Sequence, residues 1–193
     1  MGNNRGRLRE TKEQLMKNTK LHDLVITAAF IALTYVFTFI NVRLPIAANG
    51  GLVHLGNIPL FIGAIIFGKR VGGLAGGVGM GLFDLLGGWT AWAPFTFVIC
   101  GLMGIAVGAI CENHHDYLHY VLALIAACAI KIVGYYIAEG IIYGNWVAPV
   151  SSIPGNFVQV GLGAAVTLAV VDRLYKLANH MGLTHHKKSQ QPA

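Results

Sequence analysis

Long apolar segments constrain the fold of this chain more than any other feature of its sequence. They run at about 24–41, 55–67, 71–87, 94–111, 118–142 and 153–175, and clusters of Gly, Pro, Asn or charged residues separate them. Apolar residues make up 55% of the chain and charged residues only 11%, a balance unlike that of a water-soluble domain. A bilayer span takes roughly 20 residues, so 193 residues hold up to about six spans. The sequence therefore predicts a polytopic membrane protein.

We expect these segments to be helices. A backbone in lipid must satisfy its own hydrogen bonds, and the strands of a membrane barrel would alternate apolar with polar residues, which these segments do not do. The segment at 55–67 is short, because its residues rise only about 20 Å against a hydrocarbon core of roughly 30 Å. It must start deep, tilt or be completed by a structured loop. The predicted fold class is all-α, a bundle of six transmembrane helices.

The positions of Lys and Arg predict the orientation of this bundle. Arg43 falls on one side of the predicted membrane and Lys131 falls inside a segment, while the remaining basic residues share the other side. These are Arg5, Arg7, Arg9, Lys12, Lys17, Lys20, Lys69, Arg70, Arg173, Lys176, Lys187 and Lys188. Basic residues stay on the cytoplasmic side, so both termini are predicted to be cytoplasmic and the protein to lie in the plasma membrane.

The same pattern divides the chain into a basic cytoplasmic tail at 1–20, a membrane domain at 21–176 and a second cytoplasmic tail at 177–193. The net charge of +6 is thus explained mostly by topology. The tails lack the interleaved aromatic residues and the motifs of nucleic-acid-binding proteins, so no nucleic-acid partner is expected.

Polar residues inside the segments concentrate toward the predicted outer side. They are Asp84, Lys131, Tyr135, Glu139, Asn156 and Gln159. Ionisable groups in a membrane are costly and usually face a cavity, the bundle interior or each other. Lys131, Tyr135 and Glu139 are spaced by four residues, so they line one helix face. This one-sided arrangement predicts a cavity that opens outward and captures an external solute.

Other roles are compatible with the same residues. Lys131 and Glu139 can form an internal ion pair that holds the fifth helix against a neighbour. Trp89 and Trp92 suit an interfacial aromatic belt as well as a ligand cover. His54, a single histidine in a loop, also suits a structural or solvated position.

No cofactor, metal site or enzymatic centre is expected. The cysteines at 100, 111 and 128 lack metal-ligand spacing, and the His-rich stretch at 112–119 falls in a predicted cytoplasmic connection. The sequence contains no phosphate-binding loop of the G-x-x-x-x-G-K-S/T type and no recognisable nucleophile with its base. ATP-driven uptake would therefore need partner proteins.

Small residues mark two helix surfaces. Gly72, Gly76 and their neighbours on the third segment set up small-xxx-small patterns that allow close packing of helices within the protein. Ala28 and Ala32 lie one helical turn apart on the first segment and form a smooth strip on which another helix can lie.

Four stretches, taken in order, resemble the S components of energy-coupling factor (ECF) transporters. They are residues 50–59 (GGLVHLGNIP), 83–88 (FDLLGG), 92–97 (WAPFTF) and 153–159 (IPGNFVQ). The resemblance covers about residues 21–176 and is greatest to the branch assigned to hydroxymethylpyrimidine, a thiamine precursor, or to pyridoxine. It implies a six-helix protein that binds its vitamin from outside without acting as an enzyme.

The resemblance also implies partners and site residues. The partners are a transmembrane coupling protein, which would contact Ala28 and Ala32, and two cytoplasmic ATPases. The positions that match the ligand site of the family are Asn49, His54, Trp89, Trp92, Thr96, Tyr135, Glu139, Asn156 and Gln159. Alternatives are another vitamin (pantothenate, riboflavin or a queuosine precursor), a stand-alone carrier or channel, and a membrane enzyme.

Overall fold

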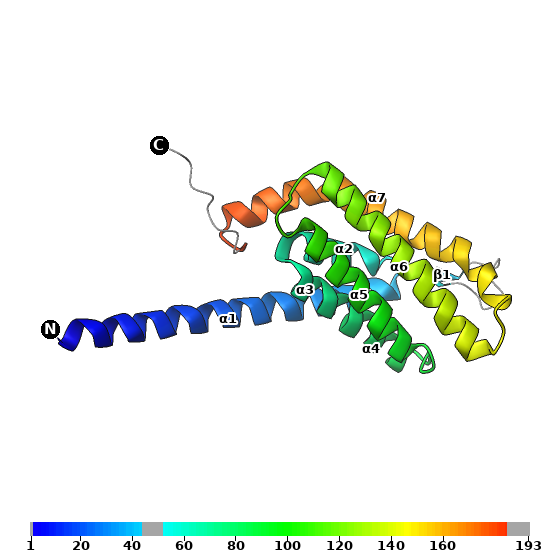
Figure 1. Cartoon of the computed structure of the whole chain (residues 1–193), viewed down its shortest axis with the longest axis horizontal. Coiled ribbons are helices and arrows are strands. Elements are labelled where there is room, and N and C mark those ends of the chain that lie inside the picture. The colour runs from blue at the N-terminus through cyan, green and yellow to red at the C-terminus, as the bar shows by residue number, and fades with distance from the viewer. Residues whose placement is uncertain (1, 44–51, 185–193) are drawn as a thin grey trace.

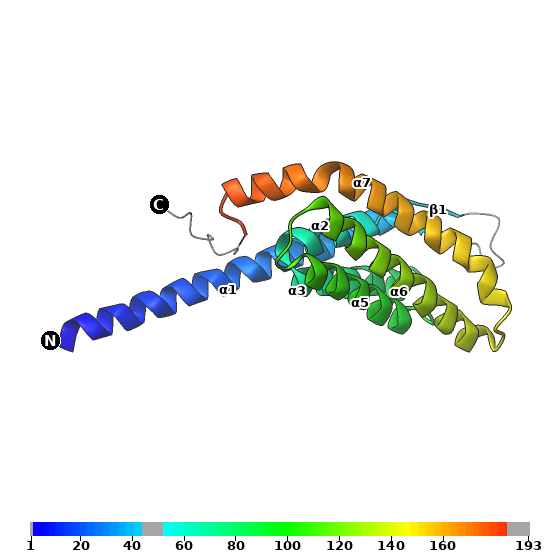
Figure 2. The ribbon, with the colours of Figure 1, turned by 45° about the horizontal axis from the view of Figure 1, so that its top comes forward.

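The computed structural model describes residues 2–43 and 52–184, and almost all of its regular structure is helical (Figure 1). In chain order the elements are α1 (Gly2–Phe39), β1 (Asn41–Arg43), β2 (Leu52–His54), α2 (Asn57–Phe67), α3 (Lys69–Leu74), the π-helix η1 (Ala75–Met80), α4 (Gly81–Leu86), α5 (Ala93–Cys111), α6 (Tyr117–Tyr143), the 3-10 helix η2 (Ala148–Ser152) and α7 (Ile153–His180). Each predicted apolar segment coincides with helix. The N-terminal part of α1 projects away from the bundle in both ribbon views (Figure 2).

Four helices in the described part are long and apolar enough to cross a membrane: Thr19–Phe39, Ala93–Cys111, Tyr117–Tyr143 and Ala148–His180. This confirms a helical protein with several apolar helices. The predicted count of six crossings depends on the two remaining stretches, α2 and residues 69–86. The first is short, and the second is divided by η1.

Local signals explain where the helices begin and end. Gly68 has φ +88°, in the region that favours glycine, and it separates α2 from α3. The Asp116 side chain accepts a hydrogen bond from the backbone N–H of His119 and so caps the start of α6. Gly144, with φ +61°, ends α6 in the left-handed conformation.

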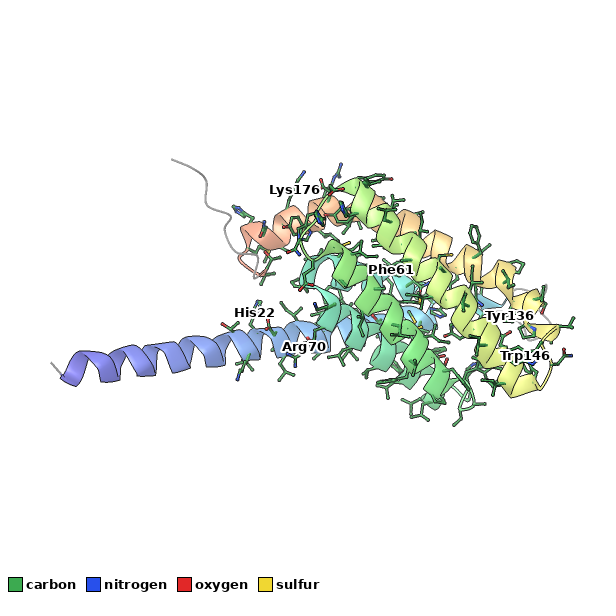
Figure 3. The ribbon with its side chains drawn as sticks, in the orientation of Figure 1. His22, Phe61, Arg70, Tyr136, Trp146 and Lys176 are labelled. Atoms are coloured by element: carbon green, nitrogen blue, oxygen red, sulfur yellow. The ribbon has the colours of Figure 1, made fainter. Side chains whose placement is uncertain are left out.

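The short helix α2 forms the centre of the bundle. It packs against α1, α3, α5 and α7, and its Leu60, Phe61 and Ala64 are fully buried. Phe61 lies at mid-length of the bundle in Figure 3. Because α2 is enclosed by protein, its short length is compatible with a membrane setting.

Residues 69–86 run as one helical stretch that packs backbone to backbone against α5. A Cβ atom at Gly72 would collide with the carbonyl oxygen of Gly104, and one at Gly76 would collide with the carbonyl oxygen of Cys100. We call this contact, at Gly72, Gly76 and Gly104, the glycine seam. It confirms the predicted close packing of the third segment, and it fixes the height of α4 relative to α5.

A two-stranded antiparallel hairpin joins α1 to α2 and corrects the purely helical expectation. It pairs Asn41 with His54 and Val42 with Val53. The first segment was expected to continue to residue 41, but α1 ends at Phe39, where the Asn41 amide donates to the Thr38 and Phe39 carbonyls. Those hydrogen bonds compete with continuation of the helix.

Candidate vitamin-binding pocket

A cavity of about 100 Å³ lies where α4, α6, α7 and the hairpin meet. Figure 3 shows Tyr136 and Trp146 toward one end of the bundle and Arg70 and Lys176 toward the other. The cavity lies toward the first end, because its lining includes Tyr135 and Glu139, which neighbour Tyr136 in α6. Its lining residues are Leu52, His54, Asp84, Trp89, Trp92, Lys131, Tyr135, Glu139, Ser152, Gly155, Asn156 and Gln159.

Most of the residues predicted for the site line this one cavity. Those that do are His54, Trp89, Trp92, Tyr135, Glu139, Asn156 and Gln159. Thr96 lies behind the lining, and Asn49 lies outside the described residues. Their assignment to ligand binding stays a prediction. The structure does bring His54 of the hairpin and Asn156 of α7, which are distant in the sequence, into the lining of the same cavity.

Thr96 connects two polar residues of the lining. Its hydroxyl donates to Asp84 Oδ2 at 2.5 Å and lies 2.9 Å from the hydroxyl of Tyr135. A hydroxyl has one proton to donate, so Tyr135 must donate to Thr96 in turn. Thr96 is buried but does not belong to the cavity lining, so it orients Asp84 and Tyr135 from behind the cavity wall.

Lys131 places an ammonium group in the buried part of the site. Its side chain is 1% exposed, and Nζ lies 5.1 Å from the centre of the Tyr135 ring. No carboxylate within the described residues forms a salt bridge with it. The alternative of an internal Lys131–Glu139 ion pair is therefore wrong for this structure. The physical reason is distance, since eight residues along one helix separate the two positions by about 12 Å.

His54 faces the site as a neutral ring. Burial lowers the pKa of His54 well below its usual value, and the charge of Lys131 lowers it further. The Nδ1 atom accepts a hydrogen bond from the backbone N–H of Gly56 at 3.2 Å. The ring proton is therefore on Nε2, which makes His54 a hydrogen-bond donor through that atom.

Several buried polar atoms at the site have no hydrogen-bond partner among the described residues. They include Oε2 of Glu139, Nε2 of Gln159 and Oδ1 of the neighbouring Asn57. The Asn57 amide donates instead to the backbone oxygen of Gln159 at 3.5 Å, which ties α2 to α7. Buried polar groups are normally paired, so the two of these atoms that belong to lining residues, Oε2 of Glu139 and Nε2 of Gln159, are candidates for hydrogen bonds to a ligand.

Aromatic rings surround the same end of the cavity. The Trp89 and Trp92 rings meet edge to face with centroids 5.5 Å apart, and Trp92 meets Tyr143 at 6.0 Å. Gly88, with φ +88°, turns the chain from α4 into this Trp segment. The rings supply flat apolar surface on which a planar ligand can stack.

Five lining residues are not among the positions matched to the ligand site of the family: Leu52, Asp84, Lys131, Ser152 and Gly155. Asp84 and Lys131 do belong to the costly polar residues from which the cavity was predicted, so that signal was enough to find them. The helix face predicted to carry Asn156 and Gln159 extends one turn toward the N-terminus. It also includes Ser152 and Gly155, because residues three or four positions apart share a helix face.

The strip predicted for partner binding lies on the outside of α1. Ala28 and Ala32 are exposed, whereas Thr27, Thr34 and Thr38 are buried on a different face of the helix. Of the four long apolar helices, α1 is the least covered by the rest of the protein. The strip is therefore free to contact lipid or another helix.

Comparison with known proteins places this chain in a defined family. A family profile described as ECF-type riboflavin transporter, S component, matches residues 18–176. An uncharacterised protein of Pyrococcus woesei is 34% identical over 133 residues, which are 65% of this chain and 89% of that protein. The thiamine precursor transporter HmpT of Lactococcus lactis subsp. cremoris is 30% identical over 155 residues, 78% of this chain and 86% of that protein.

A solved structure titled as the S component of a bacterial ECF transporter has the same fold. It superposes with a TM-score of 0.68 over 82% of this chain and 98% of its own, at 19% identity. The family is one of membrane transporter subunits for vitamin uptake, not of enzymes. The chain therefore belongs to the family described as ECF-type riboflavin transporter, S component.

Proposed function

We propose that this protein captures a single-ring vitamin precursor, hydroxymethylpyrimidine or pyridoxine, on the outer side of the plasma membrane. It then delivers this ligand inward with a transmembrane coupling protein and two cytoplasmic ATPases. The observation that carries the proposal is the cavity lined by two tryptophans and by two polar groups that lack a partner among the described residues. These groups are the buried ammonium of Lys131, which forms no salt bridge there, and Oε2 of Glu139, which has no hydrogen bond there. The protein performs no chemistry on the ligand.

The proposed topology has six crossings with both termini in the cytoplasm. Its support is the separation of charge from the pocket: Arg70 and Lys176 lie at one end of the bundle, while Tyr136 and Trp146 lie at the end that holds the cavity (Figure 3). Basic residues favour the cytoplasmic side. The cavity then faces outward, as capture of an external vitamin requires.

The size of the cavity favours one ring over three. Its volume of about 100 Å³ is well below the roughly 300–1,000 Å³ of sites for drug-sized ligands. Riboflavin carries three fused rings and a ribityl chain, whereas hydroxymethylpyrimidine and pyridoxine each have one six-membered ring. The 30% identical relative named as a thiamine precursor transporter points the same way.

The polarity of the cavity suits such a ring. Lys131 Nζ and His54 Nε2 present hydrogen-bond donors, which fit a hydroxymethyl or phenolic oxygen. The free oxygen of Glu139 presents an acceptor, which fits an exocyclic amine or a ring N–H. Hydroxymethylpyrimidine carries an amine beside its hydroxymethyl group, and pyridoxine carries a phenolic oxygen on a basic ring.

The coupling partner is proposed to dock on the exposed strip of Ala28 and Ala32. Small side chains let another helix approach closely, and interhelical packing of this kind drives association within a membrane. Thr34 and Thr38 of α1 are buried, whereas Ala28 and Ala32 are exposed, so the strip is accessible to a partner.

Binding and uptake experiments test the two halves of this proposal separately. The purified protein should bind hydroxymethylpyrimidine or pyridoxine and bind riboflavin far more weakly, as measured by quenching of tryptophan fluorescence. Liposomes that contain this chain alone should accumulate no ligand, whereas those that also contain the coupling protein and ATPases should do so with ATP. Absence of binding to both single-ring vitamins would refute the substrate, and uptake by the chain alone would refute the need for partners.

A further inference from the structure

Asp84 lies in α4 and contributes a second carboxylate, in addition to that of Glu139, to the lining of the cavity. We propose that Asp84 accepts a hydrogen bond from an N–H group of the ligand ring and so selects rings that carry such a group. The N–H group is the exocyclic amine of an aminopyrimidine or the ring N–H of a pyridinium. This inference rests on the proposed function, because it assigns a specificity-determining residue within the same site.

Main-chain contacts fix the position of Asp84 at the junction between α4 and the Trp segment. The backbone N–H of Trp89 donates to the backbone oxygen of Asp84 at 2.8 Å. The glycine seam holds the same helical stretch, residues 69–86, closely against α5. The carboxylate therefore starts from a fixed point of the backbone beside the tryptophans that line the cavity.

A chain of hydrogen bonds orients the Asp84 carboxylate. Thr96 donates to its Oδ2 atom, and Tyr135 donates to Thr96. Because the Tyr135 proton is used in this way, the Cys100 thiol, whose Sγ lies 3.7 Å from the Tyr135 oxygen, must donate to Tyr135. Every proton along the chain thus points toward Asp84, and Oδ2 is the final acceptor.

The other carboxylate oxygen, Oδ1, remains available to a ligand. Within the described residues the Asp84 side chain accepts a hydrogen bond from Thr96 alone, and that bond uses Oδ2. Asp84 also forms no salt bridge with Lys131 there, although both residues line the cavity. A carboxylate only accepts hydrogen bonds, so the group that pairs with Oδ1 must be a donor.

The charged groups of the lining favour a ring with N–H groups over a ligand with a carboxylate. Among the described lining residues, Asp84 and Glu139 supply two carboxylates, whereas Lys131 supplies one ammonium and His54 is neutral. A ligand carboxylate can pair with Lys131 only while it shares the small cavity with two groups of its own charge, which repel it. An aminopyrimidine or a pyridinium instead offers N–H groups to the carboxylates and an oxygen to Lys131. The predicted class therefore excludes acidic vitamins such as pantothenate.

Paired ligands test this role in the full chain. Hydroxymethylpyrimidine is compared with its desamino analogue, and pyridoxine with an analogue in which C–H replaces the ring nitrogen. Asp84→Asn is the informative variant, because the Asn oxygen still accepts from Thr96 while its NH₂ group takes the place of Oδ1 and can only donate. We expect this variant to lose roughly tenfold or more in affinity for the ring with the N–H group and little for its analogue. The affinities for the two members of a pair should therefore converge.

Two further variants separate orientation from contact and supply a control. Thr96→Val removes the hydrogen bond that orients Asp84, so it should reduce the discrimination within a pair, and Thr96→Ser should restore it. Asp172→Asn is the matched control, because Asp172 is an exposed acid of α7 outside the cavity lining. It should bind every ligand like the unaltered protein.

The outcomes distinguish the role of Asp84 from the proposed function. Unchanged discrimination in Asp84→Asn, or an equal loss of affinity for a ligand and its analogue, would overturn the role of Asp84 while leaving the proposed function in place. Binding of neither vitamin by the unaltered protein would refute the proposed function, and the role of Asp84 with it.

Discussion

Replacement of Gln159 by Met separates ligand binding from stability in a single side chain. Gln159 lines the cavity, is 2% exposed and has an Nε2 atom without a partner among the described residues. Met is similar in length but cannot donate a hydrogen bond. If Nε2 donates to the vitamin, its loss removes that hydrogen bond only in the ligand-bound state.

The expected magnitude follows from the burial of this group. A buried hydrogen bond whose partner is left unsatisfied costs about 1–3 kcal/mol, which corresponds to roughly 5- to 150-fold in Kd. Without ligand, Gln159→Met removes a buried donor that was unpaired, so the free energy of unfolding should not fall. The affinity is thus expected to fall, while the free energy of unfolding stays the same or rises.

Fluorescence of Trp89 and Trp92, which line the cavity, reports binding of hydroxymethylpyrimidine or pyridoxine, and thermal unfolding reports stability. Thr167→Val is the matched control, because Thr167 is fully buried in the same helix with an unpaired hydroxyl but lies outside the cavity. It should leave affinity unchanged. Equal affinity in Gln159→Met and the unaltered protein, or an equal loss in Thr167→Val, would refute the reasoning.

Further variants test the ammonium group, the glycine seam and the α1 strip. Lys131→Met should weaken binding of hydroxymethylpyrimidine by roughly tenfold, but should have little effect on an analogue without the hydroxyl group, as measured by titration calorimetry. Gly104→Ala should destabilise the protein by about 1–3 kcal/mol in thermal unfolding, whereas Gly101→Ala, whose Cβ would meet no atom closer than 3.6 Å, should not. Ala28→Leu with Ala32→Leu should abolish uptake in cells that contain the partners while leaving vitamin affinity intact; lost affinity would contradict the docking role.

Much of the fold follows from the length of the apolar segments. Helices fill all of them because a backbone in lipid has few other ways to satisfy its hydrogen bonds. The short segment at 55–67 became understandable only from packing, since nearly all residues of α2 are buried by protein. The hairpin and the π-helix η1 depend on tertiary contacts and carry no periodic signal of their own.

The site was predictable where helix spacing brings residues to one face. Tyr135 and Glu139 share a face of α6, and Asn156 and Gln159 share a face of α7, so each pair was found from the sequence. The role of Thr96 as a positioning residue was not predictable, because it depends on how α5 packs against α4 and α6.

The glycine seam bears on how one scaffold can accommodate different vitamins. Its backbone contacts leave no room for added side chains, so substitutions there should be selected against whatever the ligand is. None of its residues lines the cavity, whereas the cavity wall is built from side chains of α4, α6 and α7. Libraries that vary Glu139, Asn156 and Gln159 while keeping the seam constant should therefore yield folded proteins with altered ligand preference.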